Sequence, residues 1–315
     1  MFGVALRDTG LPLGDLTALA RAADDAGYAS IWTPEVGSRD AISLAALYGQ
    51  STRRATIGTG VIPLYSRNVA TLALSVATAA EACEGRFVLG LGAGHSFAAQ
   101  AWYGAQWRRP RKRMRETVEV LRRVLSGERV SHDGEFKLAG LHLGSNPPAV
   151  PIYLAALSPA SLRLAGEVAD GVILNWLPPE GIEKAALLAR EAAADAGRRV
   201  HVISYVRTIV VEDPSDEHIA REALREQTYS YLSLPNYANS VRTVGLGREI
   251  DAMTSGKEPA VDTLVNALCA FGDPLSVRKQ LASYTDAGLD SVIVYPVGFG
   301  DDPAAALLHT IRALA

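Results

Sequence analysis

The sequence predicts an α/β fold, a closed (β/α)8 barrel. Short runs rich in β-branched residues alternate with longer amphipathic segments along the 315 residues, and this alternation repeats eight times. Most of the short runs are apolar at successive positions, which is typical of parallel strands covered by helices on both faces. An open doubly wound sheet would place a glycine-rich turn after the first strand, where this chain has Arg7-Asp8-Thr9-Gly10. We therefore expect one barrel domain over residues 1–315.

Eight strands are expected, and helices follow most of them. The strands are expected at residues 2–6, 30–33, 55–62, 86–91, 151–155, 171–175, 201–211 and 291–295. The helices are expected at residues 13–26, 41–50, 69–83, 111–125, 159–168 and 303–314. Gly27 stands where the first helix would end and Pro159 where the fifth would begin, since glycine suits the residue after a helix and proline suits its first turn.

Two segments depart from the repeat. Residues 127–150 are expected to hold a hairpin that turns at Asp133-Gly134, a dipeptide typical of tight β-turns. Residues 229–271 add helical and aromatic sequence before the last strand–helix unit. An insertion at that point is a candidate lid over the mouth of the barrel.

Composition and charge exclude several classes of protein. The chain is 48% hydrophobic and its formal charge is −3, so neither a disordered chain nor a nucleic-acid binder is expected. No apolar run reaches the ~20 residues that span a bilayer, and the first residues lack the pattern of a signal peptide. Cys83 and Cys269 are too few and too far apart for a disulfide framework. We therefore expect a soluble cytoplasmic protein with no membrane partner.

In a (β/α)8 barrel, the residues after each strand surround one mouth, where active sites are built. The sequence has no His/Asp/Glu cluster at metal-binding spacing, no Gly-x-Ser-x-Gly turn and no Walker-type phosphate loop. No metal site is therefore expected, and an organic cofactor is the natural remaining source of reactivity. Residues expected at the mouth include Arg7, Asp8, Glu35, Arg67, His95, Asn175 and Trp176.

Several motifs follow one another over nearly the whole chain. They are residues 57–61 (IGTGV), 65–67 (YSR), 85–94 (GRFVLGLGAG), 151–159 (PIYLAALSP), 169–176 (ADGVILNW), 272–274 (GDP) and 287–290 (AGLD). Together they resemble the bacterial-luciferase-like flavin and deazaflavin oxidoreductases. Arg39-Asp40-Ala41 is similar to the methylenetetrahydromethanopterin reductase branch, which uses the 5-deazaflavin coenzyme F420 in place of FMN. The resemblance implies F420 as cofactor, FMN as the alternative, a small-molecule substrate and a homodimer.

The resemblance also implies how the third strand holds the cofactor. It places a cis peptide bond between Gly60 and Val61, where the backbone would press on the central ring, with Thr59 and Gly92 beside it. Glycines in a strand also fit a simple bulge at the barrel rim.

The cofactor phosphate is expected at Ala156, Leu157 and Ser158, and Asn175 is expected beside the cofactor. The amide groups and the positive dipole end of a helix that begins after Ser158 would attract a phosphate. Ser158 also fits ordinary helix capping, and both interpretations can hold for the same residue.

His95 and Glu35 are the candidate catalytic residues. The ordinary pKa of histidine, ~6.5, suits proton transfer at neutral pH. Glu35 is the carboxylate directly after the second strand, and its alternative role is to pair with Arg39 or Arg67. The residues expected to contact substrate are Trp32, Tyr65, Arg67 and Trp176, with Phe97 as a further aromatic side chain at the mouth.

One position departs from the methanopterin reductases, which carry a glutamate in the first strand, where this chain has Ala5. Three functions stay open: hydride transfer with F420, an FMN-dependent monooxygenase, and a non-catalytic flavin-binding barrel, which the loss of this acid favours. The basic run at residues 108–115 (RRPRKRMR) is interpreted as a solvated helix face or as an attraction site for the oligoglutamate tail of a deazaflavin coenzyme.

Overall fold

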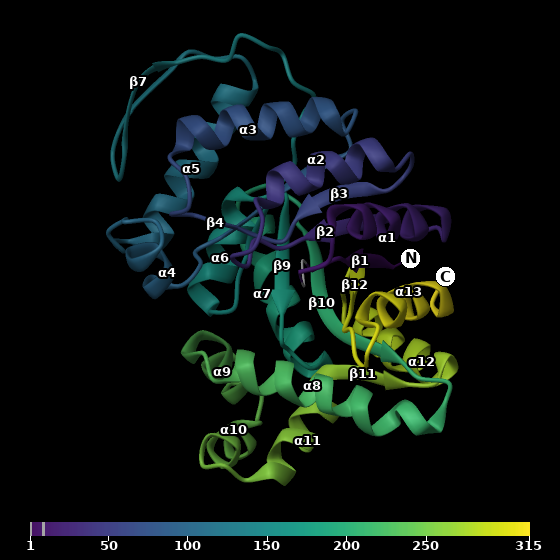
Figure 1. The fold of residues 1–315 in the computed structure, drawn as a ribbon. Helices are drawn as coiled ribbons and strands as arrows, with labels where there is room; N and C mark the ends of the chain where they lie inside the picture. The colour runs from purple at the N-terminus through teal and green to yellow at the C-terminus, as the bar shows by residue number, and fades with distance from the viewer. Residues whose placement is uncertain (1, 8–9) are drawn as a thin grey trace.

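The computed structural model describes residues 2–7 and 10–315, so Asp8, expected at the barrel mouth, lies outside the described residues. Eight parallel strands form a closed barrel in its centre (Figure 1). Each barrel strand pairs with the next along the chain, and the last pairs with the first. The strands are β1 (Gly3–Ala5), β2 (Ser30–Thr33), β3 (Thr56–Thr59), β5 (Phe87–Gly92), β8 (Ile152–Ala155), β9 (Gly171–Asn175), β10 (His201–Val210) and β12 (Ser291–Pro296). The predicted (β/α)8 barrel is confirmed.

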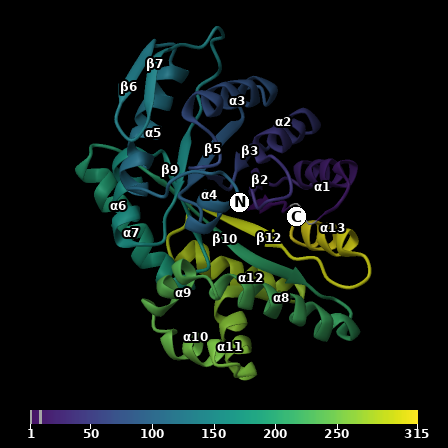
Figure 2. The same cartoon turned by 60° about the vertical axis from the view of Figure 1, so that its left-hand side comes forward.

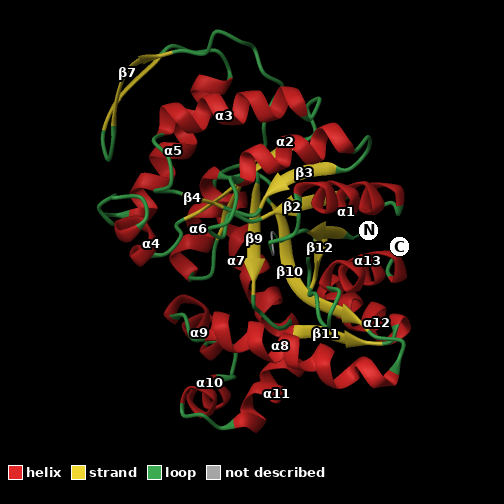
Figure 3. Cartoon of the chain, viewed as in Figure 1, coloured by secondary structure: helices red, strands yellow, loops and turns green. Residues whose placement is uncertain are grey.

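Helices cover the outside of the barrel, as the red ribbons in Figure 3 show. They are α1 (Leu13–Asp25), α2 (Ala41–Ser51), α3 (Val69–Ala82), α5 (Pro110–Leu125), α6 (Pro159–Val168), α7 (Pro179–Asp195), α12 (Pro274–Asp286) and α13 (Pro303–Ala313). The six expected helices end within a residue of their expected limits, whereas α7 and α12 were not among them. In α5 the buried positions Met114, Val118, Leu121 and Val124 recur every three or four residues, so one face packs on the barrel.

The hydrophobic core has two parts that follow from the alternation of side chains along each strand. Inward-facing residues fill the barrel: Ala5, Trp32, Val88, Ile173, Ile203, Tyr205, Ile293 and Tyr295. A larger set of aliphatic side chains lies between the strands and the surrounding helices. Both faces of the sheet are therefore covered, which explains the apolar runs of the strands.

Residues 127–150 contain an antiparallel pair, β6 (Val130–Asp133) and β7 (Lys137–Leu141), which Figure 2 shows beside α5. Asp133 pairs with Lys137, so the turn covers residues 134–136 instead of the expected two-residue turn at Asp133-Gly134. Glu116 of α5 anchors this turn, because its carboxylate accepts a hydrogen bond from the Glu135 backbone N–H (2.7 Å).

The second insertion begins earlier than expected, at Glu217. It contains α8 (Glu217–Leu232), α9 (Pro235–Arg242), α10 (Gly247–Thr254) and α11 (Glu258–Leu268), which lie together below the barrel in Figure 1. A short 3-10 helix, η1 (Pro214–Asp216), precedes α8. The segment ends in an unexpected strand, β11 (Cys269–Gly272), which pairs with residues 207–210 of β10. The insertion has its own apolar core, which includes Trp176 and Val297 from the barrel.

Candidate active site

The third barrel strand is interrupted by a bulge. Gly58 of β3 pairs with Val88 of β5, and Ile62 of the short strand β4 (Ile62–Pro63) pairs with Leu91. Four steps along one strand thus match three along the other, which leaves one extra residue. The Gly60–Val61 peptide bond within this bulge is cis, at the position that the family resemblance implies.

Thr59 bridges the gap that the bulge opens. Its buried hydroxyl accepts a hydrogen bond from the Gly90 backbone N–H (2.9 Å) and donates one to the Gly90 carbonyl (3.1 Å). The Thr59 side chain therefore replaces a missing pair of strand-to-strand hydrogen bonds. The Thr59 hydroxyl points toward β5 and stabilises the bulge through these hydrogen bonds.

Two glycines allow the backbone and side chains around the bulge to approach closely. A Cβ at Gly60 would lie 1.6 Å from the Tyr205 hydroxyl, and a Cβ at Gly92 would lie 2.5 Å from Cγ2 of Val61. Both positions therefore exclude a larger residue unless the neighbours move. Val61, held between Gly60 and Gly92, is partly buried and packs against the barrel core.

A buried arginine lies across the barrel from the bulge. Arg207 has 2% of its surface exposed, and it follows Ile203 and Tyr205 on the inward-facing side of β10. Its Cζ lies 4.4 Å from the ring centre of Trp176, 4.8 Å from that of Tyr231 and 4.1 Å from that of Tyr295. Asn175, at the end of β9, accepts a hydrogen bond from Nη1 of Arg207.

Helix α9 connects three sides of the barrel mouth. The Tyr237 hydroxyl lies 3.4 Å from the amide nitrogen of Asn175, and its ring centre lies 6.4 Å from that of His95, after β5. Ser240 donates a hydrogen bond to the carbonyl of Leu157, after β8 (3.4 Å). Burial raises the pKa of Tyr237 to about 12, so this side chain is a neutral hydrogen-bonding group at physiological pH.

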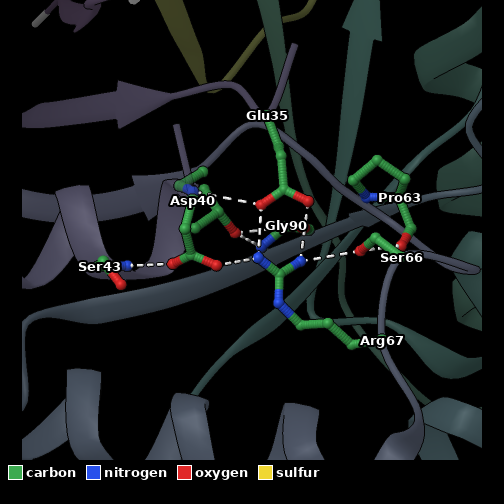
Figure 4. Close-up of polar contacts among 9 residues, drawn as sticks. Glu35, Asp40, Ser43, Pro63, Ser66, Arg67 and Gly90 are labelled. Carbon is green, nitrogen blue, oxygen red and sulfur yellow. Dashed lines mark hydrogen bonds and ion pairs between the residues drawn. The ribbon is translucent and has the colours of Figure 1, made fainter. Parts of the chain in front are cut away.

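Glu35 and Arg67 form an ion pair at the rim (Figure 4). The guanidinium donates to both carboxylate oxygens of Glu35, at 2.8 and 2.6 Å, and it also contacts Asp40. Asp40 in turn accepts a hydrogen bond from the Ser43 backbone N–H (2.6 Å) and caps α2. Glu35 is therefore paired with Arg67, which is the alternative to a catalytic role that the sequence left open.

His95 lies at the mouth, where it precedes the first turn of α4 (Ser96–Ala101). Partial removal from water lowers the pKa of His95 below its ordinary value of 6.5. The imidazole is therefore neutral at neutral pH, and one of its ring nitrogens can accept a proton.

Ser158 caps helix α6. Its hydroxyl accepts a hydrogen bond from the Ser161 N–H (3.3 Å), and the Ser161 hydroxyl accepts one from the Ser158 N–H (3.0 Å), so the two form a capping box. Ala156 is buried and donates its N–H to the carbonyl of Ile173 (3.2 Å), whereas Ser158 is exposed at the start of the helix. The capping interpretation thus holds.

Two aromatic residues expected to contact substrate have their side chains buried elsewhere. Trp32 is 3% exposed inside the barrel core and donates from Nε1 to Ser30 (2.8 Å), toward the end opposite the mouth. Tyr65 packs on Trp107 and donates its hydroxyl to the Arg108 carbonyl (2.7 Å). Both side chains are thus buried in packing contacts, and contact of Trp32 and Tyr65 with substrate stays a prediction.

The other two residues expected to contact substrate, Arg67 and Trp176, do lie at the rim, although Trp176 is 2% exposed beneath Tyr231. Its φ angle of 56° turns the chain sharply after β9. Phe97, at 69% exposure, is accessible on the surface of α4.

Three of the six basic residues in the run at residues 108–115 pair with acidic side chains. Arg109 and Lys112 lie 3.4 Å from Glu135, and Arg115 pairs with Glu167. Arg113 instead packs over the rings of Tyr65 and Phe136. This pattern matches the expected solvated helix face.

Over residues 2–7 and 10–315, no group of three His, Cys, Asp or Glu side chains is arranged to hold a metal ion. Within the same described part of the chain, no helix is long and apolar enough to cross a membrane.

The comparisons with known proteins agree with this geometry. Residues 2–291 match the luciferase-like monooxygenase family. The chain belongs to that family. It is 30% identical over 300 residues to the 5,10-methylenetetrahydromethanopterin reductase of Archaeoglobus fulgidus, covering 90% of each chain. It is 29% identical over 297 residues to an F420-dependent glucose-6-phosphate dehydrogenase of Nocardia farcinica, covering 89% of this chain and 86% of that one.

Solved structures support the fold of the luciferase-like protein. The F420-dependent tetrahydromethanopterin reductase of Methanopyrus kandleri superposes with a TM-score of 0.82 at 22% identity, over 99% of this chain and 97% of that one. An F420-dependent secondary alcohol dehydrogenase superposes with a TM-score of 0.80 at 19% identity, over 100% and 99%. At these identities the likeness concerns the barrel fold alone.

The residues at the mouth fit a bound organic cofactor. Nε of Arg207, the Tyr205 hydroxyl and Nε1 of Trp176 are buried without a hydrogen-bond partner among the described residues. Buried polar atoms are normally satisfied, so unpaired atoms gathered at one mouth indicate a place where a ligand with polar groups binds.

Arg207, Tyr205 and Tyr237 were not among the candidates that the sequence indicated. The signal for Arg207 was present: it is a single charged residue inside the apolar strand HVISYVRTIV. A charged residue is almost never fully buried unless it is paired, so its place in an apolar strand is a signal. Tyr237 belongs to the insertion, and its approach to the mouth depends on the path of α8 and α9.

Proposed function

We propose that this luciferase-like protein is an oxidoreductase that transfers a hydride between coenzyme F420 and a small organic substrate. The observation that carries the proposal is the arrangement of the mouth, where the glycine-lined bulge faces a group of buried polar atoms without partners. The relatives from Archaeoglobus fulgidus and Nocardia farcinica, which match about nine-tenths of this chain, support F420 as the cofactor.

The chain's own residues would hold the cofactor from several sides. The Gly60–Val61 segment would contact the ring, and Gly92 would leave room for the side chain of Val61 behind it. The amide groups at the start of α6, after Ser158, would receive the phosphate. Asn175 would offer its side-chain amide to the ring edge.

Coenzyme F420, when bound, accepts or donates a hydride and reacts poorly with oxygen. In this protein His95 would accept or return the accompanying proton, because its lowered pKa keeps it neutral at neutral pH. Glu35 would act through Arg67 by fixing the rim of the mouth. Helices α8 and α9, as a lid, would exclude water from the site.

Oxygen use separates this function from that of an FMN-dependent monooxygenase. The purified protein is mixed with chemically reduced F420 in one assay and with FMN and a flavin reductase in another. A panel of carbonyl compounds is added to each mixture, and oxygen uptake is measured. We expect oxidation of reduced F420 by a carbonyl compound under anaerobic conditions and no added oxygen uptake with FMN. Oxygen uptake that depends on a carbonyl compound in the FMN assay, without oxidation of reduced F420 in the other, would refute the proposal.

We also propose that the protein acts as a cytoplasmic homodimer. Light scattering coupled to gel filtration would give about twice the chain mass of 33.4 kDa, whereas the mass of one chain would refute the dimer.

A further inference from the structure

Among the described residues, no carboxylate neutralises the buried positive charge of Arg207. Only 2% of the residue is exposed. Ion pairs join other arginines to acidic partners, as in Arg67 with Glu35, but among the residues described, none has a carboxylate within 4 Å of the Arg207 guanidinium. A buried charge without an opposite charge is costly, so its presence needs a compensating interaction.

The groups around Arg207 offset this cost only in part. The three aromatic rings of Trp176, Tyr231 and Tyr295 face the guanidinium, and such faces attract cations. Asn175 offers one neutral oxygen. Nε of Arg207 keeps an unused hydrogen-bond donor.

The positive charge of Arg207 affects the pKa of the tyrosines around it. Burial raises the pKa of Tyr205 and, to about 12, that of Tyr237, and the positive charge of Arg207 opposes both shifts. Both phenols stay protonated at neutral pH. The Tyr205 hydroxyl is then a second buried group without a partner, two residues before Arg207 on the same inward-facing side of β10.

We propose that Arg207 binds an anionic oxygen of a ligand in the barrel mouth, with the Tyr205 hydroxyl as a second donor. Such an oxygen supplies the negative charge that the guanidinium lacks and accepts the hydrogen bond of Nε. It belongs either to a carboxylate of the substrate or to the coenzyme ring, both of which carry delocalised negative charge on oxygen. The inference rests on the proposed function only if the oxygen belongs to the coenzyme ring.

Arg207→Met tests the proposal because methionine fills a similar volume without the charge. Arg67→Met is the matched control, since it removes a rim arginine whose charge Glu35 and Asp40 neutralise. Without ligand, R67M should lower Tm by several degrees because it leaves two carboxylates unpaired. R207M should keep Tm or raise it by about 2 °C or more, because it removes an uncompensated charge.

Two binding measurements identify the source of the anion. In the first, F420 is titrated into wild type and into R207M, and the fluorescence of F420 is followed. An affinity for F420 that is about 10-fold or more lower in R207M than in wild type assigns the oxygen to the coenzyme. In the second, Tm is measured with benzoate and with its neutral isostere benzamide. If benzoate but not benzamide raises the Tm of wild type, and benzoate does not raise the Tm of R207M, the oxygen belongs to a substrate carboxylate.

The proposal is overturned if R207M binds F420 as wild type does and benzoate protects neither protein more than benzamide. If R207M does not fold, Arg207→Lys replaces it in the titration, because lysine keeps the charge and loses the planar fork. The comparison of benzoate with benzamide on wild type needs no variant. A protein that ignores F420 but discriminates benzoate through Arg207 would refute the proposed cofactor and keep this inference.

Discussion

Both carboxylate oxygens of Glu35 accept hydrogen bonds from Arg67, at 2.8 and 2.6 Å, and each side chain is about one-tenth exposed. Arg67 also contacts Asp40, which caps α2. This arrangement ties together the segment after β2, the start of α2 and the segment after β4. Glu35, a candidate catalytic residue in the sequence, is therefore part of the framework of the mouth.

Breaking this pair should destabilise the protein. Glu35→Gln keeps the shape and removes the charge, so we expect the free energy of unfolding to fall by about 2 kcal/mol. Urea denaturation measures the loss. In the exposed pair of Arg115 with Glu167, Glu167→Gln should change the same quantity by less than about 0.5 kcal/mol. Equal effects of the two substitutions would contradict the framework role of Glu35.

Removing the Thr59 hydroxyl should weaken the bulge. Thr59→Val keeps the volume but leaves the N–H and carbonyl of Gly90 without their partner, so we expect a loss of about 1–3 kcal/mol in unfolding free energy. Thr59→Ser keeps the hydroxyl and should retain most of the stability. Chemical denaturation of the three proteins checks this, and a valine variant as stable as wild type would refute the bridging role.

The pH dependence of hydride transfer should report on His95. Its pKa lies below 6.5, so the neutral imidazole that accepts a proton predominates above that value and is lost as pH falls through it. We expect kcat/KM for reduction of F420 to rise with pH through this range and then level off. His95→Gln should remove the acidic limb of the profile. An unchanged limb in the variant would assign the proton transfer to another group.

Asp24 should make stability depend on acid. Burial alone would raise the pKa of Asp24, but the backbone N–H groups of Arg53, Arg54 and Ala55 donate to its carboxylate and lower the pKa below 3.8. The stabilisation is present above 3.8 and is lost as pH falls through the folded-state value.

In Asp24→Asn this acid dependence should shrink, and stability at pH 7 should fall by about 1–3 kcal/mol because the amide binds the N–H groups less strongly. Thermal unfolding of both proteins between pH 7 and pH 3 measures the difference. Parallel curves for the two proteins would contradict this role.

The barrel could be predicted from the sequence because each buried strand is a short apolar run and each helix begins and ends at characteristic residues. Pro159 and Gly27 mark such limits. Strand β11 could not be predicted in this way, because it is a four-residue segment that directly follows α11 and pairs only with the end of β10.

The site could be predicted less well, because a position after a strand does not fix where a side chain points. Trp32 lies near the expected mouth in sequence, but its ring enters the space that Gly58 leaves inside the barrel. Arg207 was missed although it is the single charged residue in an apolar strand, because the sequence does not show which groups surround it. Its importance follows from a three-dimensional fact, the missing opposite charge.

Titration of F420 and FMN into wild type and Gly92→Ala tests the central claim most directly. The added Cβ would lie 2.5 Å from Cγ2 of Val61, so Val61 must move from the position where it would contact the cofactor ring. We expect wild type to bind F420 in preference to FMN, and the folded variant, checked by circular dichroism, to bind F420 at least 10-fold more weakly. Tight binding of FMN without a response to F420, or equal affinity of the two proteins for F420, would contradict the proposed site.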